Sequence, residues 1–206
     1  MSFGDRRLKT IRNENLWIRL GSMWTVGFAI LFLTWILSFR SLPEGAIRGS
    51  SGVYYVPVKI QDTTMTFVRI FLWNICVGCI PVALGSLVRV KGIPLGYLLT
   101  FYHWSIYGVL LGTNSFVIPG VGKFLPSLTT LFYGSGIYEI TAYTLISSAT
   151  FALYNRVGNS RGNLDSARKQ EMFALKLSKT ELATIAFAML ILAVANYYEA
   201  WSIFHM

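Results

Sequence analysis

Long runs of apolar residues, separated by short polar segments, dominate the sequence. Residues 20–39, 70–88, 92–122 and 182–198 contain no Asp, Glu, Lys or Arg, and residues 124–155 contain one, Glu139. A helix needs roughly 20 apolar residues to cross the hydrocarbon core of a bilayer. The pattern therefore predicts about five transmembrane helices, over residues 17–39, 66–88, 93–112, 127–154 and 181–204.

The segments between these helices differ in character. Residues 40–64 are expected to form an outer loop, since Pro43, Gly45 and Gly49 interrupt regular structure there. The turn at 89–92 is so short that it predicts an antiparallel helix pair. Residues 155–179 form a basic inner loop, and Ser-Lys-Thr-Glu at 178–181 has the form of a capping box that opens the last helix. No repeat is evident, so we expect a single membrane domain.

Composition supports this interpretation. The chain has 206 residues, of which 54% are hydrophobic and only 13% are charged, against about 25% charged in soluble domains. A soluble enzyme, a disordered chain and a secreted disulfide scaffold are excluded. The predicted fold class is all-α, a polytopic helix bundle in the cell membrane and in contact with the lipid bilayer.

The net charge of +9 bears on orientation rather than on nucleic acid. With a cytoplasmic N-terminus, the inner segments hold thirteen Lys and Arg and the outer segments five. Cytoplasmic loops are enriched in Lys and Arg, so we expect the N-terminus inside and the C-terminus outside. A nucleic-acid partner is not expected, because that would need the charge gathered on one folded basic face.

Two acidic residues fall within predicted spans. Glu139 has about fifteen uncharged residues on each side, and a carboxylate at that depth is costly unless it is paired, protonated or hydrated. It is either a functional group or a hydrogen-bonded packing residue. Glu199, near the outer end of the last span, is either a second functional group or an interfacial carboxylate that reaches water. Arg69, at the outer start of the second span, is expected to pair with either acid if the outer ends converge.

The remaining chemistry-bearing residues favour packing over catalysis. His103 is expected to be a buried hydrogen-bonding histidine, and His205 stands alone. Cys76 and Cys79 have the spacing of a metal pair, but they lie within an apolar helix and supply half of a zinc site. No catalytic residues, metal site or cofactor are therefore predicted. Small residues allow close helix contact, and the expected packing positions are Gly78, Gly85, Gly96, Gly134 and Gly136.

The order of motifs from residue 66 onward is more specific than any single one. Phe67-Val-Arg-Ile-Phe-Leu-Trp-Asn74 enters the second span, and Gly134-Ser-Gly-Ile-Tyr-Glu139-Ile-Thr-Ala142 and Ala195-Asn-Tyr-Tyr-Glu199-Ala200 follow in the fourth and fifth. This order resembles the stage II sporulation protein M family of integral membrane proteins, over about residues 66–206. Many members carry a His where this chain has Ser135. The resemblance implies a non-enzymatic protein of a membrane complex, which in endospore formers holds peptidoglycan-remodelling enzymes.

Three functions follow from these observations. The leading hypothesis is a structural or assembly subunit of a larger membrane complex, with other membrane proteins or further copies of the chain as partners. The alternative is a permease or channel component that uses an intramembrane carboxylate. The third is a membrane enzyme acting on lipid, which only Glu139 and His103 favour.

Overall fold

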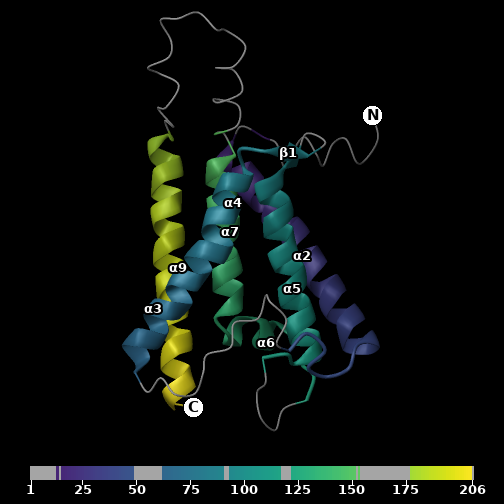
Figure 1. The fold of residues 1–206 in the computed structure, drawn as a ribbon. Coiled ribbons are helices and arrows are strands. Elements are labelled where there is room, and N and C mark those ends of the chain that lie inside the picture. The colour runs from purple at the N-terminus through teal and green to yellow at the C-terminus, as the bar shows by residue number, and fades with distance from the viewer. Residues whose placement is uncertain are drawn as a thin grey trace, which may run out of the picture.

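The computed structural model describes residues 13, 15–48, 62–90, 93–116, 122–151, 153 and 177–205. Within these ranges the fold is all-α, with six helices when the continuous Thr63–Gly85 segment is counted as one (Figure 1). The elements are α2 (Leu16–Ser41), α3 (Thr63–Trp73), the π-helix η1 (Asn74–Cys79), α4 (Ile80–Gly85), α5 (Leu95–Thr113), α6 (Leu128–Tyr133), α7 (Gly136–Thr150) and α9 (Lys179–His205). Two short strands, β1 (Arg89–Val90) and β2 (Ile93–Pro94), pair antiparallel at the predicted turn between α4 and α5.

Three helices in the described residues are long and apolar enough to cross a membrane: Leu16–Ser41, Thr63–Gly85 and Lys179–His205. They match the first, second and fifth predicted spans to within three residues. The third predicted span, 93–112, is helical as α5 but does not meet the same criteria. The fourth, 127–154, is not one helix, because the helical conformation is interrupted between α6 and α7. Five spans therefore remain a prediction, while a protein with several membrane-crossing helices is supported.

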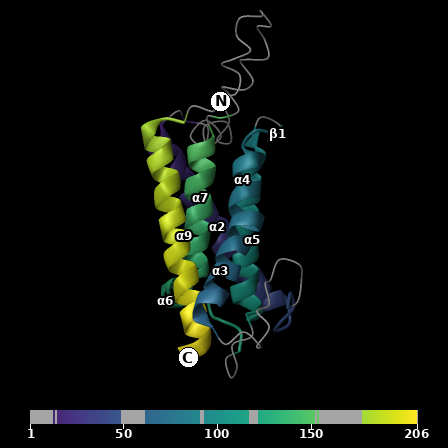
Figure 2. The ribbon, with the colours of Figure 1, turned by 60° about the vertical axis from the view of Figure 1, so that its left-hand side comes forward.

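The short helix α7 lies at the centre of the bundle, between α9 on one side and α4 and α5 on the other (Figures 1 and 2). Eleven of its 15 residues are buried, and at about 1.5 Å per residue it is about 22 Å long. Its hydroxyls bind neighbouring helices: Trp104 Nε1 donates to Thr144 Oγ1 at 3.1 Å, and the hydroxyls of Ser86 and Thr150 lie 2.8 Å apart. These bonds tie α7 to α5 and to the end of α4.

Glycines set the closest helix contacts. A Cβ on Gly108 would lie 2.2 Å from Thr34 Oγ1, and one on Gly112 would lie 2.1 Å from Ser38 Oγ, so α2 and α5 touch along this stripe. The α4–α5 pair meets where Gly85 and Gly96 face each other. Gly85 and Gly96 were among the predicted packing positions, whereas Gly108 and Gly112 were not, although Gly108-x-x-x-Gly112 is a recognised pattern for helix contact.

The second long helix changes its winding halfway along. At the end of η1, the Ile80 amide donates to the carbonyl oxygen of Ile75, five residues earlier. Pro81 follows immediately and has no N–H to donate to the preceding turn, which explains why the α-helical pattern is interrupted here. The π-helix begins at Asn74, and such turns frequently occur at functional sites.

The ends of the bundle are partly described. The start of α2 and the end of α9 lie at opposite ends (Figure 1). The capping box is confirmed: Glu181 Oε2 accepts from the Ser178 amide at 2.7 Å, and Ser178 Oγ accepts from the Glu181 amide at 3.2 Å. Most of the predicted outer loop 40–64 and inner loop 155–179 lies outside the described residues, which include only 40–48, 62–64 and 177–179 of them.

Candidate functional site

The break between α6 and α7 determines where Glu139 lies. Gly134 ends α6 in an extended conformation and Ser135 precedes the first residue of α7. Glu139 is therefore in the first turn of α7 and not in the middle of a long helix, as the sequence had indicated. The positive end of the helix dipole favours a carboxylate at this position.

Glu139 meets Glu199, which comes from α9 and is sixty residues later in the chain. Their carboxyl groups lie close enough for each to influence the ionisation of the other. Ser135 Oγ also donates to Glu199 Oε2 at 3.1 Å, which ties the helix break to α9. Both glutamates are partly buried. The two acids that the sequence analysis treated separately thus form a single pair.

Asn74, the first residue of the π-helix, connects this pair to a third helix. Its Nδ2 donates to Glu139 Oε1 at 3.1 Å and to Asn196 Oδ1 at 3.0 Å, and its Oδ1 accepts from the Tyr143 hydroxyl at 2.9 Å. Asn74 thus binds side chains of both α7 and α9. We call the set of Asn74, Ser135, Glu139, Tyr143, Asn196 and Glu199 the carboxyl cluster.

Arg69 does not take part in the carboxyl cluster. Its side chain is exposed, and no ion pair joins it to either glutamate within the described part of the chain. The reason is helical geometry, since five residues separate Arg69 from Asn74 and about 100° per residue places them roughly 140° apart around the helix. The expected pairing of Arg69 with an acid is thus not found.

Without Arg69, the two glutamates have no positively charged partner among the described residues. Within the described ranges of the chain, Cys79, Tyr107 and Tyr143 are the other ionisable groups that interact with the pair, and none of them is a cation. Two negative charges about 4 Å apart repel by about 4 kcal/mol at an effective dielectric of about 20. A fully ionised pair is therefore strongly disfavoured in this environment.

The other predicted site residues surround the cluster as packing groups. His103 lies with its ring centroid 4.8 Å from that of Tyr143, and its Nδ1 is 2.7 Å from the Leu99 carbonyl oxygen. Gly78 lies directly under the Tyr143 ring, and Gly136 lies against the ring of Tyr107. Gly134 makes no such contact, because a Cβ there would meet only the Tyr107 hydroxyl, at 3.7 Å.

Four polar residues that bind between helices were not among the predicted site residues: Arg19, Asn74, Tyr143 and Asn196. Asn74 and Asn196 are amides within charge-free segments, a signal comparable to an intramembrane acid. Arg19 was considered only as a topological charge, yet it is buried. Its Nη2 donates to the Ser148 carbonyl oxygen at 2.8 Å, and its guanidinium lies 4.7 Å from the centroid of the Phe151 ring.

Comparisons with protein families, with curated proteins and with solved structures found no match to this chain. The site therefore has to be interpreted from its own geometry.

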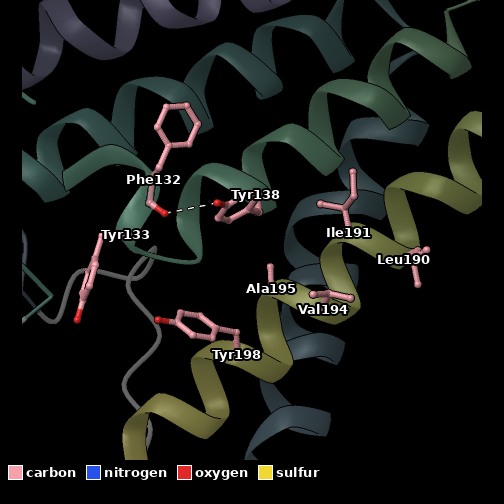
Figure 3. Close-up of a pocket in the computed structure, with 8 residues that line it drawn as sticks. All are labelled: Phe132, Tyr133, Tyr138, Leu190, Ile191, Val194, Ala195 and Tyr198. Atoms are coloured by element: carbon pink, nitrogen blue, oxygen red, sulfur yellow. Dashed lines mark hydrogen bonds between the residues drawn. The ribbon is translucent and has the colours of Figure 1, made fainter. Parts of the chain in front are cut away.

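An aromatic groove lies beside the carboxyl cluster, between α9 and the α6–α7 break (Figure 3). It has a volume of about 590 Å³. Its lining residues are Phe132, Tyr133, Tyr138, Leu190, Ile191, Val194, Ala195 and Tyr198. The Tyr138 hydroxyl donates to the Phe132 carbonyl oxygen at 3.4 Å, which holds one wall of the groove to α6 (Figure 3).

The cluster offers groups for hydrogen bonding and proton exchange. Among the described residues, no three His, Cys, Asp or Glu side chains are grouped so that they could hold a metal ion. The Ser135 hydroxyl donates to a carboxylate oxygen and not to a histidine base, so it lacks the partner that activates a nucleophilic serine.

Proposed function

We propose that this chain is a non-enzymatic, multi-pass membrane protein that acts as a structural or assembly subunit of a larger membrane complex. The observation that carries the proposal is the aromatic groove on α9. It lies on a helix able to span the bilayer, so its occupant must be a lipid chain or another helix. The resemblance to the stage II sporulation protein M family supports the same role.

The occupant we propose is a transmembrane helix of a partner protein. The groove follows α9 from Leu190 to Tyr198, which is about 12 Å of helix. Tyr198 stacks on Trp201, and its hydroxyl has no hydrogen-bond partner among the residues described. A helix with a hydroxyl or an accessible carbonyl can pair with it, whereas a lipid tail has no polar atom to offer.

The test compares two tryptophan substitutions at similarly exposed positions. Val194 lines the groove and is 62% exposed, and Leu33 on α2 is 59% exposed. After extraction from native membranes in mild detergent, the wild-type chain should migrate as a complex of defined mass. Val194→Trp should release the partner by filling the groove, while Leu33→Trp should leave the complex intact.

The other outcomes count against the proposal. A wild-type chain that is extracted alone, or with lipid as its only companion, would refute it. A complex that contains only copies of this chain would replace the partner protein by a homo-oligomer. Equal behaviour of the two variants would exclude the groove as the contact.

The second candidate is a permease or channel component, and the carboxyl pair at a helix break favours it. Transporters place ion and substrate sites where membrane helices are interrupted. Under this hypothesis Glu139→Gln should abolish proton- or ion-dependent uptake into liposomes even though the protein still assembles. Under the assembly hypothesis Glu139→Gln, which keeps the shape and the hydrogen bonds, should function normally. We expect the Gln variant to be tolerated.

A further inference from the structure

The contact between Glu139 and Glu199 requires a proton. An ionised carboxylate only accepts hydrogen bonds, so two carboxyl groups can bond to each other only when a proton lies between them. The two groups come from different helices, α7 and α9. Hydrogen bonds bring them together: Asn74 Nδ2 donates to Glu139 Oε1 and to Asn196 Oδ1, three residues before Glu199, and Ser135 Oγ, four residues before Glu139, donates to Glu199 Oε2.

Asn196 supplies an independent indication of a ligand. The residue is 0% exposed, and its Oδ1 accepts from Asn74 Nδ2, which also donates to Glu139. None of the described residues accepts a hydrogen bond from its own Nδ2. A buried donor of this kind is costly unless an acceptor reaches it, and a water molecule is the usual acceptor in a polar pocket.

The pair lies near one end of the bundle. Glu199 is six residues before the last residue of α9, which is about 9 Å of helix, and Ser135, Glu139 and Glu199 are partly exposed at the break between α6 and α7. Water at that membrane surface is the source of the exchanged proton in this proposal.

In the part of the chain that the structure describes, the groups that face the pair supply no positive charge. From α5 comes Tyr107, from α7 Tyr143 and from η1 Cys79, all of which are neutral near pH 7 at their ordinary values. Arg69, on α3, is turned away and exposed. The charge of the cluster is thus set by how many protons the two carboxyl groups hold.

We propose that Glu139 and Glu199 form a proton-binding site in which one proton is shared between the two carboxyl groups and exchanged with water held by Asn196. In the uptake step a hydronium ion transfers its proton to a carboxylate oxygen. One O–H bond breaks in the hydronium and one forms on the glutamate, and the remaining water accepts the Asn196 N–H. This activity goes beyond the assembly role and does not depend on it.

The first experiment follows the protonated carboxyl C=O stretch by infrared spectroscopy of the full-length protein in liposomes while the pH is varied. The wild-type pair should titrate in two steps more than one pH unit apart, because its groups are coupled. In Glu139→Gln and in Glu199→Gln, the remaining acid should titrate in a single step that lies between the two wild-type steps. Glu44→Gln, at an exposed position, is the control and should leave both steps unchanged.

Independent acids would behave differently. Each single substitution would then delete one wild-type step and leave the other unmoved, and that result would overturn the proposal.

The second experiment needs no substitution, so it remains valid if a variant fails to fold. Dicyclohexylcarbodiimide reacts with protonated carboxyl groups in apolar surroundings. Near neutral pH, peptide mapping of the wild-type protein should find one adduct per chain, on either Glu139 or Glu199, and its yield should fall as the pH rises through the upper step. No adduct on either residue, or adducts on both residues of the same chain, would refute a single shared proton.

Discussion

Replacing Gly78 by Ala tests whether the carboxyl cluster is held by helix packing. A Cβ at this position would lie 2.4 Å from Cε1 and Cζ of Tyr143 and 2.6 Å from its hydroxyl oxygen. The Tyr143 ring has little freedom to yield, since its hydroxyl is bound to Asn74 at 2.9 Å and its ring packs against His103. Either the hydrogen bond breaks or the π-helix moves away from α7.

The expected cost follows from these two consequences. Forcing a methyl group into a packed interior typically costs about 1–3 kcal/mol. A lost interhelical hydrogen bond in a membrane bundle adds roughly 0.6 kcal/mol. Gly78→Ala should therefore destabilise the protein by about 1.5–3.5 kcal/mol, even though alanine is the better helix former.

Thermal unfolding in detergent measures this effect, with Gly21→Ala as the control. A Cβ on Gly21 would meet nothing within 4 Å, so that variant should melt at or slightly above the wild-type temperature. In a Tyr143→Leu background the ring is gone, and Gly78→Ala should cost at least about 1 kcal/mol less than in the wild type. Additive effects of the two substitutions, or a Gly78→Ala variant as stable as Gly21→Ala, would refute the argument.

Two further predictions concern the charged groups. Lys123→Leu should lower the melting temperature more than Arg69→Leu, since Lys123 Nζ donates to two carbonyl oxygens at the end of α2 whereas Arg69 is exposed; a larger effect of Arg69→Leu would restore the pairing with an acid. For orientation, a cysteine at Ser51 should react with an impermeant thiol reagent added outside the cell and one at Ser160 should not, in a chain whose two native cysteines are replaced. The reverse labelling would place the N-terminus outside.

The sequence predicted the long helices well but the fourth span poorly. Glycine and serine occur both at close helix contacts and at helix ends, so Gly134-Ser-Gly136 was compatible with a continuous helix and with a break. Thr, Ser and Tyr side chains lower the hydropathy of α7, and only the tertiary structure shows that Tyr143, Thr144 and Thr150 bond to neighbouring helices.

For the site, the sequence identified the two acids but not the residues that they contact. Glu139 and Glu199 stood out because a carboxylate in a charge-free segment is costly wherever it lies. Arg69 was a natural partner by charge and depth, but its direction around the helix could not be known without the position of Asn74. The amides of Asn74 and Asn196 drew no attention because they carry no charge.

The sequence by itself thus determined which segments are apolar enough to enter a membrane, because the cost of inserting a helix sums over its own residues. The capping box at Ser178 is equally local, since its partners lie within one turn. Only the tertiary structure decided that Glu139 meets Glu199 and that Arg69 does not. Such contacts depend on the rotation of each helix about its axis, and close packing at Gly78, Gly85 and Gly96 fixes those rotations across residues far apart in the chain.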